Sequence, residues 1–206
     1  QLPITNYQLP ITNYQLPIFR ERVAMEKIKF ATVWLAGCSG CHMSFLDLDE
    51  WLIELAEKVD VVYSPVGSDI KDYPENVDVC LVEGAVANEE NLELLRKVRE
   101  RTKFLISFGD CAVTANVPGM RNMIKGTDPV LRRCYLELGD ITPQLPHFPG
   151  IVPELLERVA PVHEVVKVDM FMPGCPPSAE RIKASIEPLL HGEKPVMQGR
   201  DMIKFG

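Results

Sequence analysis

The sequence lacks the long apolar runs, the basic excess and the leader pattern that would place a protein in a membrane, on a nucleic acid or outside the cell. No apolar run approaches the roughly 18–20 residues that span a bilayer. Acidic residues outnumber basic ones, 29 to 22, and the formal net charge is −7, which argues against binding to phosphate backbones. No secretory signal precedes the first apolar segment. We therefore expect a cytoplasmic protein that neither spans a membrane nor binds nucleic acid.

Two kinds of catalytic signature are also missing, namely a nucleophile–base pair and a glycine-rich dinucleotide-binding loop. We therefore expect no complete catalytic site within this chain.

The sequence has 206 residues, 46% of them apolar, which is enough for one domain with a substantial core. It also has six cysteines. In a cytoplasmic protein these are expected to be metal ligands or free thiols rather than disulfides.

Residues 1–18 contain a seven-residue repeat, Gln-Leu-Pro-Ile-Thr-Asn-Tyr, which occurs twice in full and then begins a third time. Its period is shorter than the roughly 20 residues or more of solenoid repeats, and its prolines oppose both helices and central strands. The alternatives are a partner-binding tail and a translated repeat without a fold, and we favour the second. We expect residues 1–24 to be a disordered tail, Met25 to be the native start, and residues 25–206 to form a single domain.

Beyond the repeat, buried-type apolar runs alternate with amphipathic segments. The apolar runs predict five strands, over residues 28–36, 61–64, 77–82, 104–108 and 165–171. Helical periodicity predicts helices over residues 44–58, 89–101, 129–138, 153–159 and 178–190, with a short one after Cys111. Ser44 (in a capping box with Asp47), Asn88 and Ser178 are the expected helix caps. This alternation indicates an α/β fold with a flavodoxin-like, doubly wound, parallel five-stranded sheet.

Four cysteines follow the carboxyl ends of predicted strands. Cys38 and Cys41 follow the first strand, Cys111 follows the fourth and Cys175 follows the fifth. Because the carboxyl ends of parallel strands share one edge, where such sheets bind ligands, we expect the four thiols to lie together as ligands of a metal centre. The other two are Cys80, inside a strand, and Cys134, inside a helix. Free cysteine is among the most buried residue types, so we expect both to be interior thiols.

Four thiolates can hold either zinc or an iron–sulfur cluster. Structural zinc sites usually combine two close pairs on small loops, whereas one pair meets two isolated cysteines here. A [4Fe–4S] cluster also takes four cysteines, and it is large enough for dispersed ligands. Helices that begin just after a ligand would direct partial positive charge at an anionic cluster. We favour the cluster, and a stand-alone binding module stabilised by zinc or a cluster remains the alternative.

Three motifs now resemble a known family. They are Gly-Cys-Ser-Gly-Cys at residues 37–41, Gly-Asp-Cys at 109–111 and Pro-Gly-Cys-Pro-Pro at 173–177. In this order they resemble the proximal-cluster motifs of [NiFe]-hydrogenase small subunits. Over about residues 27–203 the chain is similar to the HoxY-type small subunits of cyanobacterial bidirectional NAD(P)-linked [NiFe]-hydrogenases. The related 20-kDa-type subunit of complex I, a quinone reductase, has two adjacent cysteines in its first motif. Ser39 and Gly40 separate them here, which favours the hydrogenase and leaves the complex I subunit as the alternative.

The resemblance implies an electron-transfer subunit with one [4Fe–4S] cluster, whose cofactor-binding and metal ligands are Cys38, Cys41, Cys111 and Cys175. It implies two kinds of partner. One is a hydrogenase large subunit that carries the Ni–Fe centre, and the other is a set of diaphorase Fe–S and flavin subunits that serve NAD(P)H. A flavodoxin-like rim can hold FMN, and some relatives contain flavin. No loop of this sequence suits its phosphate, so FMN is not predicted.

Three further features allow two interpretations each. Glu83 matches a family position near the large-subunit contact. There it either has a functional role, relaying protons or orienting a neighbour of the cluster, or it only accepts hydrogen bonds from nearby amides, and we favour the second interpretation. His42 is either a polar neighbour of the cluster or a solvated loop residue. The proline-rich segment over residues 139–153 is either part of a partner interface or a surface loop.

Overall fold

A computed structural model describes residues 27–205, so the predicted tail over residues 1–24 and the predicted start at Met25 lie outside the described residues. The described chain folds around a sheet of five parallel strands in the order β2-β1-β3-β5-β7. These strands are β1 Ile28–Trp34, β2 Val59–Tyr63, β3 Val77–Glu83, β5 Thr102–Phe108 and β7 Met170–Met172. Numbered within this sheet, the order is 2-1-3-4-5, which confirms the predicted flavodoxin-like topology.

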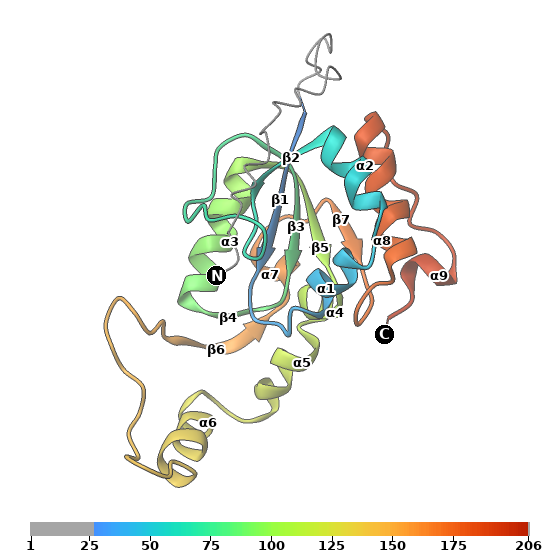
Figure 1. Ribbon diagram of the computed structural model, residues 1–206. Helices are drawn as coiled ribbons and strands as arrows, with labels where there is room; N and C mark the ends of the chain where they lie inside the picture. Colours follow the sequence, from blue (N-terminus) through green and yellow to red (C-terminus); the bar gives the residue numbers. More distant parts are fainter. Residues whose placement is uncertain (1–26, 206) are drawn as a thin grey trace, which may run out of the picture.

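Helices cover both faces of this sheet (Figure 1). One face packs against α1 Gly40–Leu46, α2 Trp51–Lys58 and α8 Ala179–Ile186, and the other against α3 Glu89–Arg101 and α7 Val162–Val165. Successive strand residues point to opposite faces, so Leu105 of β5 belongs to one core and Ile106 to the other. Burial on both faces explains why the strands are almost continuously apolar in sequence.

The single helix predicted over residues 44–58 is two helices. α1 ends at Leu46 and α2 begins at Trp51, and Asp49 between them has a φ of 48°. A left-handed residue cannot continue a right-handed helix, so the chain turns there. Ser44 lies inside α1 and is not a cap, because its hydroxyl donates a hydrogen bond to the carbonyl of Pro177 at 2.6 Å. The predicted capping box is therefore wrong, and Ser44 instead ties α1 to the loop after β7.

The helix predicted over residues 153–159 is also wrong. This segment contains β6 Leu155–Ala160, which pairs antiparallel with β4 Val86–Asn88 in a separate two-stranded sheet. Pairing between segments far apart in sequence overrides local propensity here. The strand predicted over residues 165–171 is shorter than expected, because α7 ends at Val165 and β7 begins only at Met170.

The other predicted helices are present. Asn88 caps α3 by accepting a hydrogen bond from the amide of Asn91 at 2.8 Å, and Ser178 caps α8 through the amide of Arg181 at 3.4 Å. The remaining elements are α4 Asp110–Thr114, α5 Asn116–Gly119, a 3₁₀ helix at Met120–Met123, α6 Asp128–Arg132 with a π-helical turn at Arg133–Glu137, a 3₁₀ helix at Glu187–His191, and α9 Arg200–Ile203.

The segment from α5 to β6 forms an arm that extends away from the sheet and includes α6 (Figure 1). Within residues 27–205, no helix combines the length and the apolarity needed to cross a bilayer.

Asp169 anchors β7, the short strand at the edge of the sheet. Its carboxylate accepts a hydrogen bond from the amide of Leu105 at 2.9 Å and pairs with Arg99 at 2.6 Å. Burial alone would raise the pKa of Asp169, but these hydrogen bonds and the positive charge of Arg99 lower it below its ordinary value. The ionised carboxylate therefore helps to hold the strand that leads to Cys175.

We expect Asp169→Asn to lower the free energy of unfolding at neutral pH by about 1 kcal/mol, because the charge-assisted contacts are partly exposed. A carboxyl whose folded pKa is lowered stabilises the fold above its unfolded pKa of about 3.9, and this stabilisation is lost as the pH falls through the folded value. In urea unfolding experiments the deficit should therefore shrink between about pH 7 and about pH 3. A deficit of the same size at both pH values would contradict the prediction.

Candidate metal centre

The loops that follow β1, β5 and β7 form the candidate site, at the carboxyl edge of the parallel sheet. These loops and the helices they lead into carry Cys38 and Cys41, Cys111, and Cys175, respectively. The structure therefore places the four sequence-predicted cysteines at one edge. The negative charges of the other three thiols all raise the pKa of the Cys41 thiol, so the four thiols are close enough to interact electrostatically.

The loops after β5 and β7 are joined by hydrogen bonds that extend the sheet pairing beyond its last residues. The amide of Gly109 donates to the carbonyl of Met172 at 2.8 Å, and the amide of Asp110 donates to the carbonyl of Gly174 at 2.9 Å. The Asp110 carboxylate, which is buried, accepts the amide of Gly174 at 2.6 Å. Because these residues directly precede Cys111 and Cys175, the network fixes the two thiols relative to each other.

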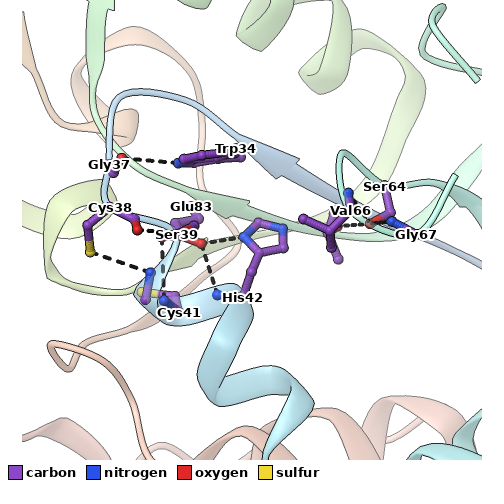
Figure 2. Close-up of polar contacts among 12 residues, drawn as sticks. Trp34, Gly37, Cys38, Ser39, Cys41, His42, Ser64, Val66, Gly67 and Glu83 are labelled. Atoms are coloured by element: carbon purple, nitrogen blue, oxygen red, sulfur yellow. Dashed lines mark hydrogen bonds and ion pairs between the residues drawn. The ribbon is translucent and has the colours of Figure 1, made fainter. Parts of the chain in front are cut away.

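Glu83 organises the other side of the site. It is the last residue of β3, it is 1% exposed, and its carboxylate accepts hydrogen bonds from the amides of Cys41 at 3.4 Å and His42 at 3.0 Å. Figure 2 shows this carboxylate facing the start of α1, where it also pairs with Nδ1 of His42. This agrees with the interpretation of Glu83 as an acceptor for nearby amides, and it positions Cys41.

His42 is not a solvated loop residue, and that alternative was wrong. It lies inside α1, is 4% exposed and packs edge-on against Phe108. Because a carboxylate only accepts hydrogen bonds, its pairing with Glu83 favours a proton on Nδ1. Within the described chain, the buried Nε2 atom has no hydrogen-bond partner.

Two glycines allow the backbone to approach the sulfur atoms closely. A Cβ at Gly109, whose φ is +85°, would lie 2.2 Å from Sγ of Cys41, and a Cβ at Gly40 would lie 3.2 Å from Sγ of Cys38. The amide of Gly40 also donates toward Sγ of Cys38 at 3.4 Å. Amide groups directed at sulfur are one means by which a protein stabilises thiolates bound to a metal.

The thiols differ in their exposure and their electrostatics. Cys41 and Cys111 are buried, whereas Cys38 and Cys175 are exposed. Burial raises the pKa of the Cys41 thiol, and the negative charges of Glu83 and of the other thiols raise it further. The pKa of Cys111 is also raised by burial and by neighbouring thiols, although the amide of Val117 opposes this. Thiolates at these positions therefore require a compensating cation, which a metal centre supplies.

The donor groups of the site can be compared with the needs of a single metal ion and of a cluster. Among residues 27–205, no three His, Cys, Asp or Glu side chains converge on a point that one metal ion could occupy. A [4Fe–4S] cluster attaches each thiolate to a different iron atom, so its ligands lie farther apart. The donor chemistry of four cysteines at one sheet edge fits such a cluster.

The remaining two cysteines lie away from this site. Cys80 is completely buried in the core between the sheet and α3, as predicted. Cys134 is exposed, and the prediction of an interior thiol was wrong. It lies in the π-helical turn after α6, on the arm that leaves the core, so helical periodicity there did not imply burial.

Two polar side chains at the site were not predicted. Asp110 could have been found, because an acidic residue between a buried strand and a cysteine loop is well placed to accept otherwise unpaired amides. Asn116 gave no signal in the sequence. Its side-chain amide lies 3.7 Å from Sγ of Cys175.

The parallel five-stranded sheet with four thiols at its carboxyl edge can be compared with known proteins. Residues 38–189 match the family described as NADH ubiquinone oxidoreductase, 20 Kd subunit, and the chain belongs to this family. The matched segment begins at Cys38 and contains all four cysteines of the site.

Individual relatives of the chain are hydrogenase subunits. The chain is 44% identical over 170 residues to the NAD-reducing hydrogenase HoxS subunit delta of Cupriavidus necator, covering 81% of this chain and 80% of that protein. It is 42% identical over 176 residues to an F420-non-reducing hydrogenase subunit of Methanothermobacter thermautotrophicus, covering 82% of this chain. The chain spans 55% of the length of the Methanothermobacter protein.

A solved structure agrees with these relatives. The chain matches a chain of NAD+-reducing [NiFe]-hydrogenase in the H2-reduced state with a TM-score of 0.82 and 40% identity, covering 87% of this chain and 99% of that one. The resemblance to NAD-linked [NiFe]-hydrogenases is thereby confirmed, and the cyanobacterial origin stays a prediction.

Gly109→Ala tests the close approach of the backbone to Cys41. The added methyl group must displace the sulfur that would lie 2.2 Å away, and overpacking of this kind costs about 1–3 kcal/mol. We expect most of the bound metal to be lost, as measured by metal analysis of the purified protein.

Gly150→Ala is the matched control, because Gly150 has a similar φ of +78° but nothing within 4 Å of an added Cβ. It places an alanine at a similarly positive φ without the steric clash, so its metal content should equal that of the unchanged chain. Full metal content in Gly109→Ala would show that Cys41 is not held as described.

Proposed function

We propose that this chain is the electron-transfer small subunit of a bidirectional NAD(P)-linked [NiFe]-hydrogenase. It holds one [4Fe–4S] cluster through Cys38, Cys41, Cys111 and Cys175. It relays electrons between the Ni–Fe centre of a separate large subunit and diaphorase subunits that contain Fe–S clusters and flavin. The observation that carries this proposal is the gathering of four thiols at one sheet edge in a chain that is 44% identical to a subunit of an NAD-reducing hydrogenase.

When bound, the cluster supplies one-electron transfer, and the residues of this chain hold it and set its environment. The Glu83 carboxylate fixes the amides of Cys41 and His42, and the Asp110 carboxylate fixes the loop of Cys175. Because these carboxylates act on ligand loops that are partly buried, they limit both the movement of the thiols and the access of water. Both factors influence the potential of an iron–sulfur centre.

The difference in exposure across the site supports a large partner. Cys38 and Cys175 face outward while Cys41 and Cys111 are buried, so one side of the proposed cluster needs cover. The arm beyond the site also exposes large apolar side chains, at Val117, Met120, Met123, Ile141, Phe148 and Ile151. Exposed apolar residues that cluster on one segment mark interaction surfaces. This supports the interpretation of the proline-rich segment over residues 139–153 as part of a partner interface.

The alternative within the same family is a 20-kDa-type subunit of complex I, after which the family is described. Two observations favour the hydrogenase. Ser39 and Gly40 separate Cys38 from Cys41, and the relatives described above are hydrogenase subunits over more than four-fifths of this chain. FMN is not part of the proposal.

Replacing any one of the four rim cysteines by alanine should abolish an intact cluster, because each thiolate would bind a different iron atom. Cys80→Ala and Cys134→Ala are the matched controls, one buried and one exposed. We expect both controls to retain the cluster. Iron and acid-labile sulfide per chain, measured on the six variants, provide the test. A full complement of iron and sulfide in any of the first four would remove that residue from the ligand set.

The isolated chain should neither take up nor evolve hydrogen. A cluster whose iron atoms are all held by thiolates offers no open metal position at which hydrogen could be split, and activity should return only when the large subunit is added. The measurement is hydrogen-dependent dye reduction by the cluster-loaded chain, alone and in the complex. Dye reduction by the chain alone would overturn the proposed relay function.

In air, the cluster of the isolated chain should decay faster than the cluster of the complex, because no large subunit covers the exposed side of the site.

A further inference from the structure

Arg181 brings a buried positive charge to the loop that carries Cys175. It lies in the first half of α8 and is only 9% exposed. Its guanidinium donates a hydrogen bond from Nη1 to the carbonyl of Pro173, two residues before Cys175. It also passes close to the intervening residue, since a Cβ at Gly174 would lie 3.0 Å from the same Nη1 atom. The cation thus lies directly against the backbone of a proposed ligand loop.

The other hydrogen bonds of Arg181 reach the C-terminal segment. Its Nε donates to the carbonyl of Asp201 at 2.6 Å, and its Nη1 donates to the carbonyl of Lys204 at 2.8 Å. These carbonyls lie in and just after α9, beyond the segment that matches the family. One side chain therefore fastens the C-terminal segment to the loop before Cys175.

All of these acceptors are backbone carbonyls. In the part of the chain that the structure describes, Arg181 forms no ion pair with a carboxylate. A guanidinium remains charged inside proteins, and a buried charge without a counterion is costly. Negative charge at this edge of the sheet comes from the thiolates and from the buried carboxylates of Glu83 and Asp110, and both carboxylates already accept hydrogen bonds from backbone amides.

We propose that Arg181 is a positioning residue that balances the negative charge of the thiolate-bound cluster and fastens residues 200–204 against the loop of Cys175. This inference rests on the proposed function, because it requires a bound cluster. Reduction adds negative charge to the cluster, so a nearby cation stabilises the reduced form more than the oxidised form. Arg181 therefore raises the reduction potential.

Arg181→Gln removes the charge and keeps a hydrogen-bond donor, whereas Arg181→Lys keeps the charge but loses the planar fork. Lys183→Gln is the matched control, since it removes one positive charge from the same helix at a side chain that packs over Trp51 of α2. Each variant is expressed with the partner subunits, and the cluster is titrated electrochemically and followed by electron paramagnetic resonance. For Arg181→Gln we expect the ratio of reduced to oxidised cluster at a fixed potential to fall about tenfold, which equals about 59 mV for one electron.

Arg181→Lys and Lys183→Gln should leave the potential near that of the unchanged protein. An unchanged potential in a fully loaded Arg181→Gln variant would overturn the inference, and so would an equal fall in Arg181→Lys. If Arg181→Gln fails to assemble, Arg181→Lys still decides the question, because charge balance requires it to retain both the cluster and the potential. Absence of a cluster from the unchanged protein would instead contradict the proposed function.

Trypsin cleavage after Arg200 and Lys204 measures the fastening directly. Both Arg181 variants should be cleaved faster there than the unchanged protein, because neither can hold both carbonyls of the C-terminal segment with a planar fork. The Lys183→Gln control should be cleaved at the unchanged rate. Equal cleavage rates in all four proteins would overturn the fastening part of the proposal.

Discussion

Parallel strand pairing is the constraint on which the whole site depends. β1, β3, β5 and β7 run in the same direction, so the chain leaves each of them at the same edge of the sheet. Residues far apart in sequence, such as Cys38 and Cys175, therefore lie at one edge although β1 and β7 are not neighbouring strands. The two packed cores hold the strands in register. A few hydrogen bonds between the loops at this edge are then enough to fix the four thiols relative to one another.

The same constraint explains what could be predicted from the sequence. Strands that are buried on both faces must be apolar along their whole length, and this made β3 and β5 visible as continuous runs. The cysteines that follow such runs could then be assigned to one edge from the sequence alone. The order of the sheet strands followed from the alternation of strands and helices.

What could not be predicted depends on pairing and packing rather than on local pattern. The turn at Asp49 requires a left-handed residue that is not glycine, and such a position has a weak sequence signal. The pairing of β4 with β6 joins segments whose own propensities do not select it. The burial of His42 could not be predicted for two reasons. It depends on α1 beginning at Gly40, inside the cysteine motif, and on packing against Phe108, which is distant in sequence.

Charge balance links the two sides of the site. On the side of β3, the Glu83 carboxylate adds negative charge beside Cys41, a position where burial already disfavours a thiolate. Its own charge is met by amides and by His42, so it holds the ligand loop in place but does not neutralise the thiolates. On the side of β7, Arg181 donates only to backbone carbonyls, so its positive charge is available to the proposed cluster. The carboxylates of Glu83 and Asp110 therefore fix the ligand loops, while Arg181 brings positive charge to the loop of Cys175 in the proposed centre.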